Sequence, residues 1–215
     1  MVKVNVLDHP LIKIKLSVLR DKNTNHTEFK ANLNEIASLM VYELLSDYKP
    51  KEICIETPTN SKTIGKCFDK EVVIVPILRA GIGMVEGIKL LLPQARVGHI
   101  GLYRDEKTLE SHEYFYKMPN VPKDSVIIVV DPMLATGGSA IDAINKLNKD
   151  GFSNIKMVSI VGAPEGINNL KQKVKNVDLF IAAIESLPAL SISFFKSFNL
   201  ESANLYPLIF SSTVC

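Results

Sequence analysis

The amino-acid sequence predicts an α/β fold in which a parallel sheet is flanked by helices. Short apolar segments rich in valine and isoleucine alternate along the chain with segments of helical periodicity. Strands buried on both faces form such continuous apolar runs, and their alternation with helices is typical of a parallel sheet. With 215 residues, 47% of them hydrophobic and 22% charged, the chain can bury one core of this kind.

The first half of the chain supplies a helix and one complete strand–helix unit. Residues 27–46 have apolar side chains near helical spacing, namely Phe29, Leu33, Ile36, Met40 and Leu44. After a turn-rich stretch, residues 72–78 (VVIVPIL) predict a central parallel strand. A helix is predicted over 84–92, because the segment is apolar and ends before Pro93.

The second half repeats the pattern. Strands are predicted at 96–103, 125–131, 155–162 and 177–184, and helices at 139–149 and within 164–175. Residues 104–123 are polar, charged and aromatic without clear periodicity, and a long loop inside a compact domain is usually functional or mobile. We therefore predict a lid there, and we expect its His112 to be solvated rather than catalytic.

We predict one domain over residues 1–215. Its core comprises about residues 50–184, and helices within 1–49 support that core. The tail at 185–215 differs from the rest: from Ser186 onward it has seven serines, four phenylalanines and no glycine. Apolar tail residues such as Phe194, Phe195 and Phe198 need cover, which predicts a homo-oligomer.

Composition limits the classes of partner and location. The formal net charge is only +2, which argues against a nucleic-acid-binding protein that neutralises many phosphates. The three cysteines show no CxxC pairing, and no His or Cys cluster has metal-ligand spacing, so free thiols in a reducing cytoplasm are expected. Charges interrupt each apolar stretch of residues 1–20, which fits neither a signal peptide nor a membrane span.

The most informative segment is VIIVVDPMLATGGSA at 126–140, where Asp131 ends a buried strand and a Thr-Gly-Gly-Ser turn opens a helix. Backbone N–H groups at a helix start bind phosphate well, and glycine permits close approach. The alternative is a structural turn with a capping serine that binds no ligand. Asp131 favours the ligand interpretation, because a carboxylate beside a phosphate site can accept hydrogen bonds from a ribose diol.

A second candidate loop is Arg79-Ala80-Gly81, which follows the apolar strand at 72–78. A tight loop can present N–H groups to a diphosphate, with Arg79 supplying positive charge. The neighbouring glycines do not form a dinucleotide fingerprint, because Glu86 occupies the place of the third glycine.

Three segments, VPILRAGIGM, GLYRDEKTLE and VVDPMLATGGSA, together resemble the uracil phosphoribosyltransferases, and the resemblance covers roughly residues 5–184. It implies a type I phosphoribosyltransferase core with a small hood. It also implies transfer of 5-phosphoribosyl from phosphoribosyl diphosphate to uracil, giving UMP, with Mg²⁺ on the diphosphate. Family members usually form dimers or larger assemblies, and GTP is a candidate allosteric activator.

The resemblance also assigns residues. Arg79 and Arg104 are the electrostatic catalytic candidates, meeting the diphosphate from two sides. The phosphate and ribose are assigned to the segment Asp131, Pro132, Met133, Leu134, Ala135, Thr136, Gly137, Gly138 and Ser139.

The tail departs from the family pattern. After Ile184 the family has an acidic, glycine-rich stretch whose backbone reads the uracil edge, and this chain has no matching residues there. No uracil-contacting residue can be assigned, whether the tail reflects a frameshift or a diverged base site. Alternatives are therefore a phosphoribosyltransferase for another base, a noncatalytic phosphoribosyl-diphosphate-binding protein and, less favoured, an RNA-binding regulator.

Overall fold

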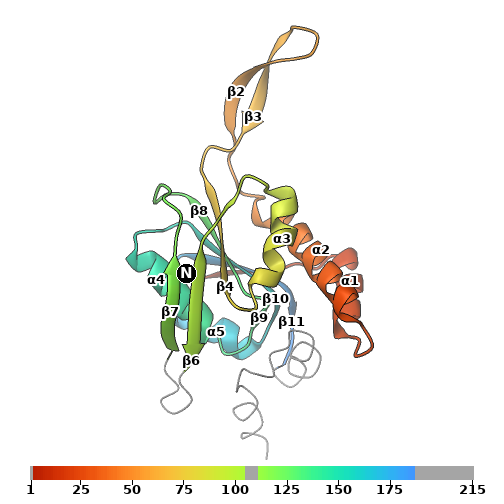
Figure 1. Ribbon diagram of the computed structural model, residues 1–215, viewed down its shortest axis with the longest axis vertical. Coiled ribbons are helices and arrows are strands. Elements are labelled where there is room, and N and C mark those ends of the chain that lie inside the picture. The colour runs from red at the N-terminus through yellow and green to blue at the C-terminus, as the bar shows by residue number, and fades with distance from the viewer. Residues whose placement is uncertain (1, 105–110, 187–215) are drawn as a thin grey trace, which may run out of the picture.

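The computed structural model describes residues 2–104 and 111–186, and Figure 1 shows their arrangement. A central sheet runs through the molecule in the order β1-β11-β10-β8-β4-β6-β7. Its strands are β1 (Lys3–Val6), β11 (Val177–Ile184), β10 (Ile155–Gly162), β8 (Val126–Val130), β4 (Val72–Leu78), β6 (His99–Arg104) and β7 (Ser111–Lys117). Two short strands, β5 (Arg96–Val97) and β9 (Met133–Leu134), pair with β4 and β10.

Helices cover both faces of this sheet (Figure 1). On one side lie α1 (Pro10–Arg20), α2 (His26–Leu44) and α3 (Ile82–Leu91), and on the other α4 (Gly138–Lys149) and α5 (Pro164–Lys173). Alternate residues of the central strands belong to two separate hydrophobic clusters: Ile74 and Ile128 pack with the first group of helices, Val75 and Val129 with the second. Every residue of β8 and β10 is buried, as the continuous apolar sequence of β8 predicts, although β10 also buries the polar residues Lys156 and Ser159.

The predicted α/β class is confirmed, and β4–β8, β8–β10 and β10–β11 are all parallel pairs. One sequence prediction is incomplete and another needs correction. Residues 1–49 hold helices that support the core, as predicted, but they also contain β1, a half-polar strand that pairs with β11. Residues 104–123 do not form one long loop, because 111–117 form β7, whose run of Tyr114, Phe115 and Tyr116 has high strand propensity.

Part of the lid, residues 105–110, and the tail phenylalanines at 194, 195 and 198 lie outside the described residues. Within the described ranges, no helix is long and apolar enough to cross a membrane. Cys54 and Cys67 carry free thiols.

A hairpin formed by β2 (Lys51–Glu56) and β3 (Lys62–Cys67) projects from the body of the protein (Figure 1). All six residues of β2 are exposed. Ile53 and Ile55 nevertheless lie on one face, where the side chain of Ile55 approaches Gly65. The hairpin therefore has an apolar face that the described residues leave largely open to solvent.

Candidate active site

The candidate site lies where β4 and β8 end, at one edge of the sheet. These strands are neighbours, so the two loops singled out in the sequence come together. A Cβ atom added at Gly81 would lie 2.3 Å from the carbonyl oxygen of Val130, the last residue of β8. Only glycine permits this contact, and it places the Arg79 loop directly against the residue that precedes Asp131.

Asp131 is held at the end of β8 by its own backbone, because its N–H donates to the carbonyl oxygen of Val158 at 3.1 Å. Burial of its carboxylate raises the pKa of Asp131 from 3.8 to about 7, while a hydrogen bond from the N–H of Met133 acts in the opposite direction. A carboxyl group with this pKa changes charge near neutral pH, and perturbed groups of this kind are often functional.

The segment after Asp131 is fixed to β10 rather than exposed as a loose loop. The carbonyl oxygen of Pro132 accepts from the N–H groups of Ile160 and Val161, both at 3.1 Å. That of Leu134 accepts from Ala163 at 2.9 Å. Pro132 and Leu134 are buried, so these two predicted site residues contribute their backbone and their packing rather than polar side chains.

Gly137 turns the chain into helix α4. Its φ is +80°, in the left-handed region that favours glycine, and an added Cβ would lie 2.8 Å from the carbonyl oxygen of Gly166. Gly166 in turn approaches Ala135 so closely that its own Cβ would lie 2.4 Å from that residue's carbonyl oxygen. Asn169 donates its side-chain amide to the carbonyl oxygen of Thr136 at 3.0 Å.

Helix α5 therefore braces the turn through Gly166 and Asn169, and sequence reasoning missed both residues. The signal for Gly166 was an isolated glycine inside a helical segment, which often marks close packing. Asn169 carried no signal, since its partner is 33 positions away in the chain.

The first turn of α4 is free to meet an anion. The N-cap is Gly137, and no side chain in the described part of the chain caps the helix. The alternative of a structural turn with a capping serine is therefore not what the structure contains, and Ser139 lies inside the helix, which begins at Gly138. Uncapped N–H groups and the positive end of the helix dipole suit a phosphate, with the exposed Thr136 and Ser139 beside them.

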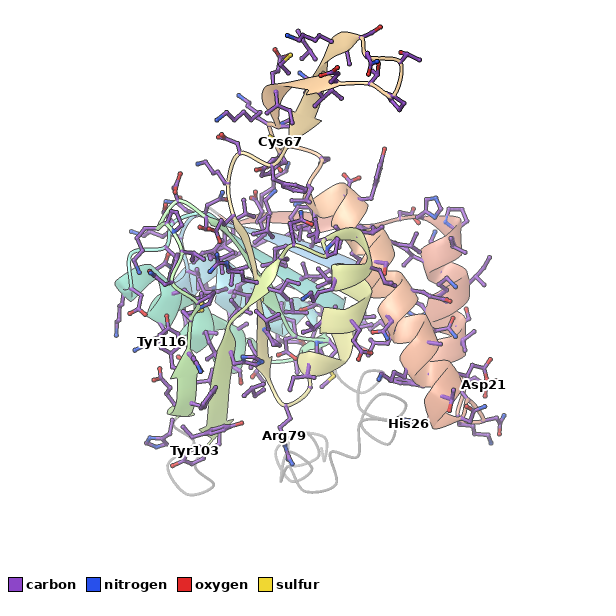
Figure 2. All side chains as sticks on the ribbon, turned by 45° about the horizontal axis from the view of Figure 1, so that its top comes forward. Asp21, His26, Cys67, Arg79, Tyr103 and Tyr116 are labelled. Carbon is purple, nitrogen blue, oxygen red and sulfur yellow. The ribbon has the colours of Figure 1, made fainter. Side chains whose placement is uncertain are left out.

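The Arg79 loop differs from its sequence prediction in one respect. The N–H groups of Gly81, Ile82 and Gly83 donate to carbonyl oxygens of Ile77, Arg79 and Ala80, at 2.9, 3.3 and 3.2 Å. These three N–H groups are therefore used within the loop and are not presented to a ligand. The Leu78–Arg79 peptide bond is cis, and the Arg79 side chain is exposed and points away from the body (Figure 2).

Arg104 is the last residue of β6, on the side of β4 away from β8. Since Leu78 pairs with Gly101, the end of β6 passes beyond the end of β4 toward the same edge. Tyr103, the preceding residue, lies at the same end of the molecule as Arg79 (Figure 2). His112 is exposed, as predicted, and stacks on Tyr103 with ring centroids 5.4 Å apart.

Among the described residues, no group of three His, Cys, Asp or Glu side chains could hold a metal ion. Within the described part of the chain, the site offers one carboxylate, that of Asp131, beside a place suited to phosphates. A Mg²⁺ ion is commonly bound through one or two carboxylates together with substrate phosphates. The residues present therefore fit a Mg²⁺ ion that arrives with a diphosphate, and do not fit a metal held by protein ligands alone.

Comparison with known proteins gives a consistent result. The sequence matches the family model described as uracil phosphoribosyltransferase over residues 6–189. It is 63% identical over 180 residues to a protein of that name from Mycoplasma mobile, covering 84% of this chain and 87% of the relative. A second, from Metamycoplasma hominis, is 58% identical over 180 residues, covering 84% and 86%.

Solved structures agree with the sequence matches. A protein from Aquifex aeolicus superimposes with a TM-score of 0.83 at 32% identity, covering 91% of this chain and 97% of that one. A hypoxanthine-guanine phosphoribosyltransferase from Bacillus anthracis gives a TM-score of 0.52 at 12% identity, covering 74% and 79%. At that identity the second likeness concerns the fold alone, which is that of the type I phosphoribosyltransferases.

Proposed function

Because this chain belongs to the uracil phosphoribosyltransferase family, we propose that its candidate site binds phosphoribosyl diphosphate and transfers the phosphoribosyl group to uracil. The products are UMP and diphosphate, and the reaction serves pyrimidine salvage. The observation that carries the assignment to these residues is the uncapped start of α4, next to a half-buried carboxyl group at the end of β8.

The α4 turn is assigned to the 5-phosphate and the ribose. The N–H groups that follow Gly137 meet the 5-phosphate, and Thr136 and Ser139 add hydroxyl groups. Asp131 accepts hydrogen bonds from the ribose hydroxyls when it is ionised. Bracing by Gly166 and Asn169 keeps the turn in place before the substrate arrives, which lowers the cost of binding.

Arg79 and Arg104 are assigned to the diphosphate. As the bond to diphosphate breaks, negative charge builds up on the leaving group while the ribose becomes cation-like. Fixed positive groups are most valuable where charge develops, and arginine pairs well with phosphate oxygens. The strand ends support this assignment, since β4 and β6 finish at the same edge as β8.

A Mg²⁺ ion on the diphosphate would add further charge neutralisation there. Among the described residues, Asp131 has the carboxylate that would lie near this ion. GTP as an allosteric activator is supported by the family resemblance alone. A cytoplasmic location is supported by the free thiols of Cys54 and Cys67, which suit a reducing compartment.

A second candidate function is phosphoribosyl-diphosphate binding with lost or altered base specificity. The family match ends at residue 189, and the residues beyond it contain no glycine. Without the family's base-reading segment, the phosphoribosyl half of the site remains recognisable while the base half does not.

We also propose a homo-oligomer in which a second copy covers the apolar face of the β2–β3 hairpin. An isolated two-stranded hairpin is marginally stable in water, so this one needs cover. Its charges are nearly balanced and partly paired within the hairpin, as in Lys66 with Glu52, which favours self-association over an anionic partner. Light scattering should give more than one subunit, and the double variant Ile53→Ser/Ile55→Ser should shift it toward monomer. A wild-type monomer across micromolar concentrations would contradict the proposal.

Calorimetry with phosphoribosyl diphosphate and Mg²⁺ tests the site, followed by an assay of UMP formation from uracil. Binding is expected whatever the rate of turnover, since the described residues supply the phosphoribosyl half. No binding at millimolar ligand would overturn the assignment. Binding without use of any base would favour the second candidate function.

A further inference from the structure

A polar cluster on β7 and α4 stands apart from the substrate-facing residues. The hydroxyl of Tyr116, on β7, donates a hydrogen bond to the carboxylate of Asp150, the C-cap residue of α4. The ammonium of Lys146, one turn earlier on α4, lies 4.5 Å from the centroid of the Tyr116 ring. It also forms an ion pair with Glu113 of β7 at 3.7 Å. Three interactions thus join one strand to one helix end.

These contacts occupy one face of the β6–β7 hairpin. Tyr116 pairs in register with Ile100 and Glu113 with Leu102, and Ile100, Leu102 and Tyr116 pack with the hydrophobic cluster beneath α4. On the other face, Tyr114 crosses Gly101 and is about half exposed. Figure 2 shows Tyr116 farther from the Arg79 end of the molecule than Tyr103. Among the described residues, the hairpin is therefore attached to α4 along one side and exposed on the other, where Tyr114 and Phe115 lie.

Asp150 is in an unusual place for an acidic residue. The C-terminal end of a helix carries partial negative charge, which disfavours a carboxylate there. Asp150 also precedes Gly151, whose φ is +90°, so turn formation is an alternative reason for an aspartate. Its acceptance of the Tyr116 hydroxyl provides a reason specific to this fold. Burial and the neighbouring Asp150 carboxylate hold the pKa of Tyr116 above its usual value, which favours the protonated hydroxyl that donates to Asp150.

The two ends of α4 then serve different parts of one site. Its N-terminal end forms the proposed phosphate turn, and its C-terminal end holds β7, which pairs with β6 up to Arg104. Since β7 is an edge strand with β6 as its neighbour in the sheet, side-chain contacts to α4 limit how far the hairpin end can shift. A shift of about 1 Å at a catalytic group can cost up to about 100-fold in rate.

We propose that Tyr116 and Asp150 are positioning residues, which fix the β6–β7 hairpin to α4 and so place Arg104 relative to the phosphate turn. The assignment rests on the proposed function, in which Arg104 contacts the diphosphate. Tyr116 and Asp150 act through Arg104 and do not touch the substrate.

The test measures affinity for phosphoribosyl diphosphate with Mg²⁺ by calorimetry on the full chain. Tyr116→Phe keeps the ring and its packing but removes the hydroxyl, and should weaken binding about threefold to tenfold. Asp150→Ala should act similarly, and Asp150→Asn, which keeps an acceptor oxygen, should restore most of the affinity. Tyr114→Phe is the matched control, since it removes a hydroxyl from the exposed face of the same strand.

A double-mutant cycle distinguishes positioning from a merely structural role. In an Arg104→Ala background, Tyr116→Phe should cause almost no further loss of affinity. If the losses of affinity caused by Arg104→Ala and Tyr116→Phe multiply independently, the assignment is overturned. Unchanged affinity in Tyr116→Phe would also overturn it. If Tyr116→Phe does not fold, Asp150→Ala takes its place in this comparison. If wild type and Tyr114→Phe bind no phosphoribosyl diphosphate, the proposed function fails as well. If they bind and Tyr116→Phe binds equally, only the positioning role fails.

Discussion

Strands β8 and β11 both end at the same edge of the central sheet, but the residues that follow them differ in the groups with which they could bind a substrate. After β8 the chain presents a carboxyl group, a glycine turn braced by α5, and an uncapped helix start. After β11, which ends at Ile184, come residues 185–215, with no glycine and with two charged residues beyond Glu185.

This comparison distinguishes the role of the sheet, which positions the strand ends, from the role of the loop residues, which recognise the ligand. Both strands are largely buried and hold their place in the parallel sheet, so the sheet brings both strand ends to the edge where ligands bind in open α/β folds. Whether a ligand is then recognised depends on the residues of each loop. The four predictions below test this contrast, from the largest expected effect to the smallest.

The first prediction concerns the base half. Replacing the residues after Ile184 by a family-type glycine-rich ending should raise UMP formation at least about 100-fold. The reason is that a base held in position reacts far faster than one that is not. An assay of UMP from uracil compares the chimera with the unmodified chain, in which transfer to uracil is expected to be slow. Equal turnover would mean that the base site lies elsewhere.

The second prediction concerns charge at the diphosphate. Arg79→Ala and Arg104→Ala should each weaken binding of phosphoribosyl diphosphate by about 1.5 to 3 kcal/mol, the range for hydrogen bonds to charged groups. Arg96→Ala is the control, because Arg96 forms a surface ion pair with Glu71 at 2.9 Å and lies near the start of β4, away from the site. Unchanged affinity in both site variants would show that the diphosphate binds elsewhere.

The third prediction separates backbone strain from ligand contact. Gly137→Ala should lower the free energy of unfolding by about 1 to 2 kcal/mol, since its left-handed backbone disfavours a side chain. It should also weaken binding of phosphoribosyl diphosphate, because the added methyl group would displace the turn from Gly166.

Gly151→Ala is its matched control. Gly151 has a φ of +90°, but an added Cβ there would meet only the Lys123 side chain at 3.8 Å. Denaturant unfolding should show a loss of stability in both variants, larger for Gly137→Ala because its added Cβ would also lie 2.8 Å from the carbonyl oxygen of Gly166. Calorimetry should show weaker binding only for Gly137→Ala. Equal binding by the two variants would contradict the role given to the turn.

How far the sequence could predict this site depends on how local each determinant is. The strands β4 and β8 were recognisable because burial on both faces imposes a continuous apolar run. The start of α4 was recognisable because glycine and small polar residues mark a helix N-terminus. The meeting of the two loops also followed from the sequence, since parallel strands end at a common edge.

The remaining features depend on contacts between distant segments. Strand β1 is short and half polar, so it became recognisable only beside β11. The bracing by Gly166 and the cluster of Tyr116 with Asp150 follow from helix packing, which has no local pattern. The use of loop N–H groups at Gly81, Ile82 and Gly83 follows from the tightness of the turn into α3. Sequence pattern therefore located the site, and packing decided which of its groups remain available.

The last prediction concerns the protonation of Asp131. Its pKa of about 7 in the folded chain lies above the ordinary 3.8, so the folded state favours the protonated form. The stabilisation from this group is complete below about pH 4 and is lost as the pH rises through 7. Ribose hydroxyls favour the ionised form, because a carboxylate accepts both hydrogen bonds. Affinity for phosphoribosyl diphosphate should therefore rise a few-fold from about pH 6 to pH 8, with proton release by Asp131 on binding.

Calorimetry in two buffers of different ionisation enthalpy measures that proton directly, and Asp131→Asn identifies its source. The ligand's own phosphate also titrates, and its contribution remains in the variant. Between pH 4 and pH 7, the free energy of unfolding should fall less in Asp131→Asn than in wild type, because the variant lacks the titrating carboxyl group. If wild type and Asp131→Asn release the same number of protons, the carboxylate at the end of β8 does not meet the ribose. The contrast between β8 and β11 would then rest on the glycine turn alone.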